Sequence, residues 1–230
     1  MTVLAGDELL RRLTDEDPAR RLVVGPLLEP MEQIKKVQAS IDIRLGCDFR
    51  LASAANIGVL DQFAPPSMNH FADLAAVYQH FYVPLGGDVT IHPHQMMLAM
   101  TLEYLRLPSD LIAYVIGRST LGRLGLIVAT AIGVHPRFYG PLTLEIRNLG
   151  EAPIRLYPGQ TIGQLFFHTI ESISYDDAFW SDTNQVSDQY SGTTDPIPRQ
   201  ISSTLTRTHL DKLRRDHQEG WAKLHSRLIT

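Results

Sequence analysis

The segment LTLEIRN (residues 142–148) decides the fold class, because apolar and polar residues alternate along it. Side chains of a β-strand point to opposite faces in turn, so a period of two predicts a strand with one buried face. The three aliphatic residues share that buried face. Glu145 shares the other face with a threonine and an arginine. The second face is either a solvent face or a site, and periodicity does not choose between them.

Short apolar runs of similar character recur from about residue 20 to residue 170. Examples are SIDIRLGCDFRL (40–51) and MMLAMTLEYLRLP (96–108), and Gly and Pro separate the runs. Many short strands at close spacing are typical of an antiparallel sandwich or barrel, whereas a parallel sheet needs a helix between strands. We therefore expect a mainly β protein, a distorted β-sandwich or barrel, with helices at its two ends.

The ends of the chain differ from this middle region. The segment DELLRRLT (7–14) predicts an amphipathic helix capped by Asp7. Apolar residues at helical spacing predict a second helix over 203–228, which packs on its own domain or on a neighbouring subunit. The segment between them is rich in Ser, Thr, Asp, Gly and Pro. The expected organisation is an N-terminal helix (1–19), a β domain (20–180), a mobile tail (181–200) and a C-terminal helix (201–230).

Composition excludes several classes of protein. The 21 Lys and Arg against 25 Asp and Glu give a net charge of −4, which argues against nucleic acid as the main partner. No apolar stretch approaches the roughly 20 residues of a membrane helix. The N-terminal segment has acids among its leucines and no long apolar run, so we expect no signal peptide. The single cysteine, Cys47, excludes a disulfide framework and a Cys-rich zinc site. We expect a cytoplasmic protein that binds neither membranes nor nucleic acids.

Two groups of residues carry candidate chemistry. The turn GRST (117–120) offers backbone amides, two hydroxyls and the guanidinium of Arg118, which together suit phosphate oxygens. A capped turn without a ligand would have the same residues. Arg123 lies five residues after Arg118, and Glu145 is a lone acid in an otherwise apolar strand.

Other polar residues favour structural roles. Asp42 and Arg44 lie in one strand-like block and predict a structural ion pair or a turn. His92 and His94 flank a proline and predict a turn between strands rather than a metal site. We therefore expect no metal site.

Four blocks in order, and a weaker fifth, resemble a known family. The chain is similar to the dCTP deaminase branch of the trimeric dUTPase superfamily. The blocks are SIDIRLG (40–46), LAMTLEYLRLPSDL (98–111), GRSTLGRLGL with TAIGVHPRFYGPLTLE (117–145), PIRLYPGQTIGQLFF (153–167) and QYSGTTDPIPR (189–199).

The resemblance implies a role for each matching residue. Glu145 would be the catalytic glutamate that moves protons while water attacks C4 of cytosine. Ser119 and Arg123 would hold the water and orient that glutamate, and the backbone carbonyl of Ala131 would contact the water. The implied substrate-binding residues are Arg118, Thr120 and Thr130, His135 beside the sugar, Phe138 on the deoxyribose, Gln164 from a neighbouring subunit, and Tyr190 and Arg199 in the closing tail.

The expected function is hydrolytic deamination of dCTP to dUTP and ammonia by a homotrimer, with dUTP and dTTP as further candidate ligands. Magnesium is expected to arrive with the triphosphate. No zinc is expected, because the Pro-Cys-x-x-Cys motif of zinc deaminases needs two cysteines. A metal-free site would use Glu145 as the base for the attacking water.

One departure from the family leaves alternatives open. His135 stands where the family has an aspartate in Asp-Pro-Gly, so an anionic acceptor beside the sugar is missing. The alternatives are a bifunctional enzyme that also hydrolyses dUTP, a deaminase of an altered cytosine nucleotide, and a nucleotide-binding regulator without turnover.

Overall fold

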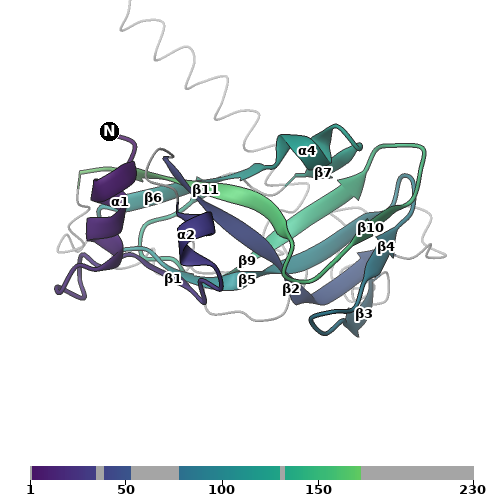
Figure 1. The fold of residues 1–230 in the computed structure, drawn as a ribbon, viewed down its shortest axis with the longest axis horizontal. Helices are drawn as coiled ribbons and strands as arrows, with labels where there is room; N and C mark the ends of the chain where they lie inside the picture. The colour runs from purple at the N-terminus through teal and green to yellow at the C-terminus, as the bar shows by residue number, and fades with distance from the viewer. Residues whose placement is uncertain (1, 35–38, 53–77, 130–132, 172–230) are drawn as a thin grey trace, which may run out of the picture. The chain divides into compact units, whose positions relative to one another are not determined.

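The computed structural model describes residues 2–34, 39–52, 78–129 and 133–171, and it is mainly β as predicted (Figure 1). The helices are α1 (Gly6–Leu13), α2 (Pro30–Gln33) and α4 (Ser119–Gly122). The strands are β1 (Val23–Gly25), β2 (Ser40–Ala52), β3 (Tyr78–Tyr82), β4 (Val89–Ile91), β5 (Met96–Arg106), β6 (Leu111–Gly117), β7 (Leu126–Val128), β8 (Gly133–Val134), β9 (Tyr139–Asn148), β10 (Ile154–Leu156) and β11 (Thr161–Thr169).

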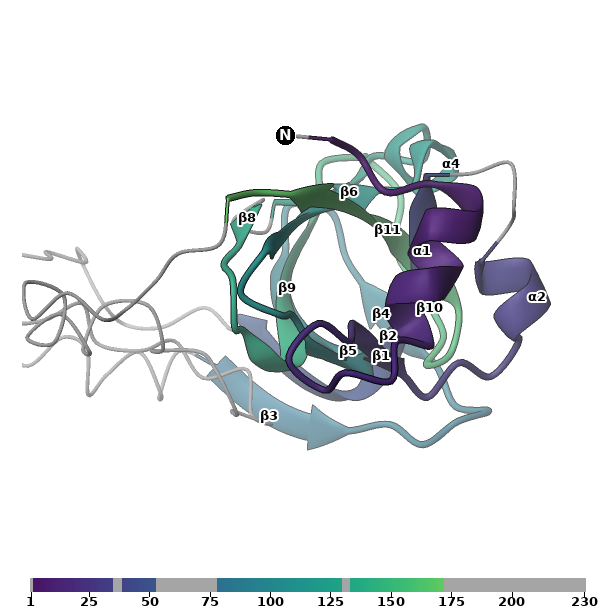
Figure 2. The same cartoon turned by 90° about the vertical axis from the view of Figure 1, so that its left-hand side faces the viewer.

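One antiparallel sheet holds most of these strands. Its order is β7-β9-β5-β2-β11-β6-β8, with β1 added to β5 and β3 added to β2, while β10 and β4 form a separate pair. The long strand β2 joins the two halves of the sheet. Its first part pairs with β11 and its second part pairs with β5. Figure 2 shows the strands curling around a common interior, so one face of the sheet becomes the core.

A glycine allows β2 to change partners. The pairing of β2 with β5 shifts register between Leu45 and Phe49. A Cβ at Gly46 would lie 2.7 Å from the backbone oxygen of Met100, which is closer than real Cβ contacts. Only glycine lets the two backbones approach this far, so any side chain at this position would push the strands apart.

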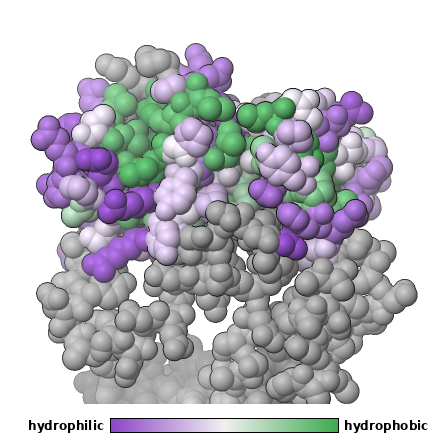
Figure 3. All heavy atoms as spheres, turned by 90° about the horizontal axis from the view of Figure 1, so that it is seen from below, coloured by the Kyte–Doolittle hydropathy of each residue, from purple (hydrophilic) through white to green (hydrophobic). Residues whose placement is uncertain are grey.

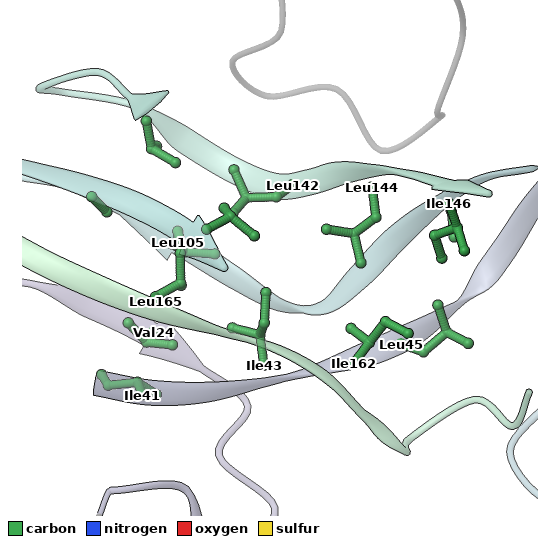
Figure 4. Packing of buried hydrophobic residues seen from close by; sticks show 14 of the residues in the cluster. Val24, Ile41, Ile43, Leu45, Leu105, Leu142, Leu144, Ile146, Ile162 and Leu165 are labelled. Carbon is green, nitrogen blue, oxygen red and sulfur yellow. The ribbon is translucent and has the colours of Figure 1, made fainter. Parts of the chain in front are cut away.

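The core consists of aliphatic side chains that point toward one another from β1, β2, β5, β9 and β11 (Figure 4). The predicted alternation in β9 is confirmed, because Leu144 and Ile146 are fully buried. Asn148, at the same parity, is fully buried too. Its amide group donates hydrogen bonds to the carbonyls of Ile91 and Ala152, so its burial leaves no polar atom unpaired.

The N-terminal helix differs in detail from the expectation. Helix α1 begins at Gly6, and its N-cap is Ala5 without a side-chain hydrogen bond, so the prediction of Asp7 as the cap is wrong. Asp7 lies in the first turn instead, where a carboxylate interacts favourably with the helix dipole. Among the described residues, no helix is long and apolar enough to cross a membrane. The predicted tail and C-terminal helix lie outside the described residues.

A buried carboxyl ties β2 to β5. Glu103 is fully buried and accepts hydrogen bonds from the backbone amide of Arg44 at 2.8 Å and from Nε2 of Gln33 at 2.9 Å. Burial raises the pKa of the Glu103 carboxyl, and these hydrogen bonds lower it only in part. Glu103 thus pairs two donors that have no access to water.

We predict that Glu103→Ala lowers the free energy of unfolding by about 2 kcal/mol or more, because two buried donors lose their acceptor. Urea denaturation measures this change. The control is Glu151→Ala, since Glu151 is exposed and should tolerate substitution. Equal stability of the two variants would contradict the role given to Glu103.

Candidate active site

Glu145 lies on the outer face of β9, between β5 and β7. In the sheet its neighbour on β5 is Leu98, which is buried, and Thr143 lies opposite the buried Met100. The Thr143 hydroxyl donates to the Met100 sulfur at 3.5 Å. Glu145 itself is half-buried. Its carboxyl therefore lies beside apolar side chains rather than on an open solvent face.

This environment changes the acid–base behaviour of the carboxyl. Desolvation raises the pKa of Glu145 above its usual value, because a partly dry site disfavours the charged form. A carboxyl with a raised pKa binds a proton more readily near neutral pH than an exposed glutamate does. Such a group suits proton transfer in both directions.

The turn expected to bind phosphate is held at the end of β6. Arg118 is the N-cap of the short helix α4, and the amide of Arg123 donates to the Ser119 carbonyl at 3.0 Å. Ser119, Thr120 and Arg123 are exposed, and their side chains make no hydrogen bond or ion pair within the described residues. These hydroxyls and this guanidinium are available to a ligand.

Within the described part of the chain, Arg118 is the one residue of this turn whose side chain forms an ion pair. Its Nη1 atom lies 2.7 Å from a carboxylate oxygen of Asp42 on β2. Gln164 on β11 pairs with both Asp42 and Ile116 across the sheet, and its Oε1 atom accepts from the Ser40 hydroxyl at 3.4 Å. Sheet register thus brings Arg118, Asp42 and Gln164 together on the outer face.

The sequence did not identify the role of Asp42. Asp42 and Arg44 do form ion pairs, but not with each other: Asp42 contacts Arg118, and Arg44 contacts Glu29 at 2.9 Å. The alternation of SIDIRLG does place Asp42 away from the core face. Nothing in the sequence indicates that β11 lies between β2 and β6 and so brings Arg118 within reach.

Strand β7 lies between the phosphate turn and Glu145. Helix α4 packs on β7 (Figure 1), and a Cβ at Gly117 would be 3.6 Å from Cβ of Val128. On the other side, the amide of Ala129 donates to the Glu145 carbonyl at 2.7 Å. The turn and the glutamate are therefore near neighbours in the fold, separated by one strand.

The loop before β9 holds the remaining described candidates. The amide of Phe138 donates to the His135 carbonyl at 3.3 Å, which closes a turn. Phe138 packs against the core, whereas His135 is exposed. Arg137 between them has a φ of 63°. The candidates Thr130, Ala131, Tyr190 and Arg199 lie outside the described residues, so their roles remain predictions. Within the described ranges, no three His, Cys, Asp or Glu residues gather as a metal site.

The fold and these residues describe a mainly β protein with a half-buried carboxyl of raised pKa and an exposed polar turn. A model of the dCTP deaminase-like family matches residues 3–170. The chain belongs to this family.

Individual relatives agree with this assignment. A dCTP deaminase of Natronomonas pharaonis is 38% identical over 164 residues, which cover 70% of this chain and 81% of the relative. A protein of Methanobrevibacter smithii named dCTP deaminase, dUMP-forming, is 38% identical over 161 residues, covering 69% and 80%.

A solved structure shares the fold. The crystal structure of 2'-deoxycytidine 5'-triphosphate deaminase from Agrobacterium tumefaciens matches with a TM-score of 0.53 at 20% identity. The match covers 73% of this chain and 48% of that one, so the chain spans about half the length of the solved chain.

We predict that Asp42 and Arg118 stabilise each other by about 1 kcal/mol, because Asp42 is largely buried while the Arg118 side chain, 37% exposed, is partly screened by water. A double-mutant cycle of Asp42→Asn and Arg118→Gln in urea denaturation measures this coupling. The fully surface pair Glu8–Arg11 is the control and should give about 0.3 kcal/mol. A coupling no larger than the control would show that the contact does not hold Arg118.

Proposed function

We propose that the protein catalyses the hydrolysis of dCTP to dUTP and ammonia. The observation that carries this proposal is the Glu145 carboxyl, half-buried beside Leu98 with a raised pKa, within the segment that matches the family. Relatives named dCTP deaminase, at 38% identity, support the choice of substrate.

Glu145 would move each proton of the reaction. Its carboxylate takes a proton from water as the water oxygen attacks C4 of the cytosine ring. The resulting carboxylic acid gives that proton to ring N3. The remaining hydroxyl proton then passes by the same carboxyl to the amino group, which leaves as ammonia while the C4 carbonyl of uracil forms. Shielding by Leu98 and Met100 favours the protonated form that this cycle requires.

The α4 turn would position the reactants. The exposed Arg123 and Ser119 can hold the attacking water and orient the Glu145 carboxylate, with the Ala131 carbonyl as a further contact. Arg118 and Thr120 can bind the triphosphate, and Gln164 lies beside Arg118. The triphosphate and the Asp42 carboxylate are both anions that bind a guanidinium, so they would compete for Arg118. We propose that magnesium arrives bound to the triphosphate and that no zinc takes part.

We also propose a homotrimer. Its support is a set of exposed apolar residues around α4 and β7, since large exposed apolar patches mark protein interfaces. Leu124 is 59% exposed, Ile127 43% and Leu149 49%. The amide of Leu149 donates to the Gly125 carbonyl, so all three lie close to the phosphate turn. A neighbouring subunit on this patch would help to enclose the site.

We predict that Glu145→Gln lowers the rate of ammonia release from dCTP by about 10²–10⁴-fold, because the amide keeps the size of the side chain but cannot act as a base. Nucleotide binding should persist. The matched control, Glu151→Gln at an exposed position, should keep full activity.

The rate of the native enzyme should fall on acidification while the pH is still above the usual glutamate pKa, since protonated Glu145 cannot accept a proton from water. A loss of less than tenfold in the rate of ammonia release by Glu145→Gln would contradict the assignment. A pH–rate profile in which the native rate falls only at the usual glutamate pKa would contradict it too.

A second candidate is an enzyme that goes on to hydrolyse dUTP to dUMP and pyrophosphate. It is favoured by the relatives named dUMP-forming. His135 argues against it, because a neutral imidazole accepts one hydrogen bond and carries no negative charge for a second hydrolytic water.

We predict that dCTP turnover accumulates dUTP, with ammonia released faster than pyrophosphate. Introducing the missing anion by His135→Asp should raise the ratio of pyrophosphate to ammonia, while His92→Asp in a distant turn should leave it unchanged. Chromatography of the nucleotides measures both products. Formation of dUMP as fast as ammonia in the native enzyme would favour the bifunctional reading.

A further inference from the structure

The block LAMTLEYLRLPSDL (98–111) contains Thr101 and Glu103, and the proposed mechanism gives neither residue a role in the reaction. On the side of the molecule where β1 and β5 lie, Figure 3 shows green apolar groups among purple hydrophilic ones. Thr101 and Glu103 contribute little to the surface, because Thr101 is 4% exposed and Glu103 is fully buried. Two polar side chains buried two residues apart in one strand need partners inside the protein.

Both residues lie at an irregularity of β5. Met100 pairs with Thr143 on β9, and Tyr104 pairs with Pro141. Three residues of β5 thus stand opposite one residue of β9, Leu142. Such a bulge interrupts the backbone ladder, so the amide of the single residue needs another acceptor.

The Thr101 hydroxyl supplies that acceptor. The amide of Leu142 donates to Oγ1 of Thr101 at 2.8 Å, and the same hydroxyl donates to the Glu103 carbonyl at 2.8 Å. Leu142 points into the core (Figure 4) and is 6% exposed, so this part of β9 is shielded from water. One side chain therefore pairs a donor of β9 with an acceptor of β5.

This contact fixes the part of β9 that carries Glu145. The pairing of the first half of β5 with β9 is regular and places Leu98 opposite Glu145. Thr101 holds the end of this regular stretch at Leu142, three residues and about 10 Å along the strand from Glu145. A bulge next to a site aims the side chains beyond it, and a slip of one residue would turn Glu145 to the core face.

Glu103 connects the same bulge to β2. Its carboxyl accepts from the Arg44 amide at 2.8 Å and from Nε2 of Gln33 at 2.9 Å. The same Nε2 atom donates to the Asp42 carbonyl at 3.0 Å. Asp42 forms the ion pair with Arg118 of the phosphate turn. The bulge is therefore connected to both parts of the candidate site.

We propose that Thr101 is a positioning residue, whose hydroxyl fixes the register of β9 and so keeps the Glu145 carboxyl beside Leu98. Thr101 itself takes no part in the chemistry. Threonine suits this position because its branched side chain has few rotamers, which keeps Oγ1 where the Leu142 amide needs an acceptor. The proposal rests on the proposed function, since that function gives Glu145 its role.

The first test compares Thr101→Val, which keeps the shape but removes the hydroxyl, with Thr101→Ser, which keeps the hydroxyl. In Thr101→Val we expect kcat for ammonia release from dCTP to fall at least about tenfold, because a small misplacement of a reacting group costs that much. KM should change little, since Glu103 and Asp42 still hold the phosphate turn. Thr101→Ser should keep kcat close to the native value.

The matched control is Thr90→Val. Thr90 lies on β4, in the separate strand pair with β10. The variant removes the same hydroxyl from a strand away from the bulge, so kcat and KM should both stay native.

A second test follows the Glu145 carboxyl in the full-length protein without substrate. Carbon-13 NMR titration measures its pKa, and the signal is assigned by its absence in Glu145→Gln. Burial raises this pKa in the native protein, so a carboxyl that moves away from Leu98 into water should titrate lower, toward the usual glutamate value. Thr101→Val should therefore lower the pKa of Glu145, whereas Thr101→Ser and Thr90→Val should not.

Three results would overturn the proposal: a native kcat with a native Glu145 pKa in folded Thr101→Val, equal losses in Thr101→Ser, or equal losses in Thr90→Val. If Thr101→Val does not fold, Thr101→Cys replaces it with the same expected directions, because a thiol accepts hydrogen bonds only weakly. Absence of ammonia release by the native protein would reject the proposed function. The NMR titration tests the positioning of Glu145 in that case as well.

Discussion

The whole structure depends on β2 being hydrogen-bonded along both edges. Ile41, Ile43 and Leu45 on this strand are fully buried, and they belong to the same core cluster as aliphatic residues of β9 and β11. Removing such aliphatic side chains from water is the main favourable term in folding. Because β2 pairs with β11 in one half of the sheet and with β5 in the other, its curvature sets that of the sheet.

The same alternation that fills the core also decides on which face of the sheet the candidate site residues lie. Every residue of β9 at the parity of Leu144 is buried, so residues at the parity of Glu145 must lie on the outer face. On β2 and β11, Asp42 and Gln164 are register partners, so their side chains share one face of the sheet. The candidate site is therefore built mainly on strands, while α4 contributes short polar side chains from a single turn. Side chains placed on strands are held more precisely than side chains placed on loops.

The sequence alone predicted the features that depend on a short segment or on a repeating pattern. The period of two in residues 142–148 predicted the strand and its buried face, and the order of the blocks predicted the family. The sequence did not predict contacts between segments that are far apart in the chain. Arg118 reaches Asp42 because β11 lies between β2 and β6, and only the order of strands in the sheet shows this. The cap at Ala5 was missed because Asp7 has the stronger intrinsic preference for that position. Burial raises the pKa of Glu145, and its neighbour in the sheet, Leu98, stands 47 positions earlier in the chain, a proximity that only strand pairing reveals.

The pairing of β2 with β11 has a consequence for synthesis on the ribosome. Gln164 reaches its place beside Ser40 only after 124 further residues have been made. At roughly 5–20 residues per second, one edge of β2 waits roughly 6–25 seconds for its partner. An unpaired edge of alternating aliphatic residues is a template for association with other chains. Nascent copies on neighbouring ribosomes would meet in this interval, when protection by a chaperone matters most.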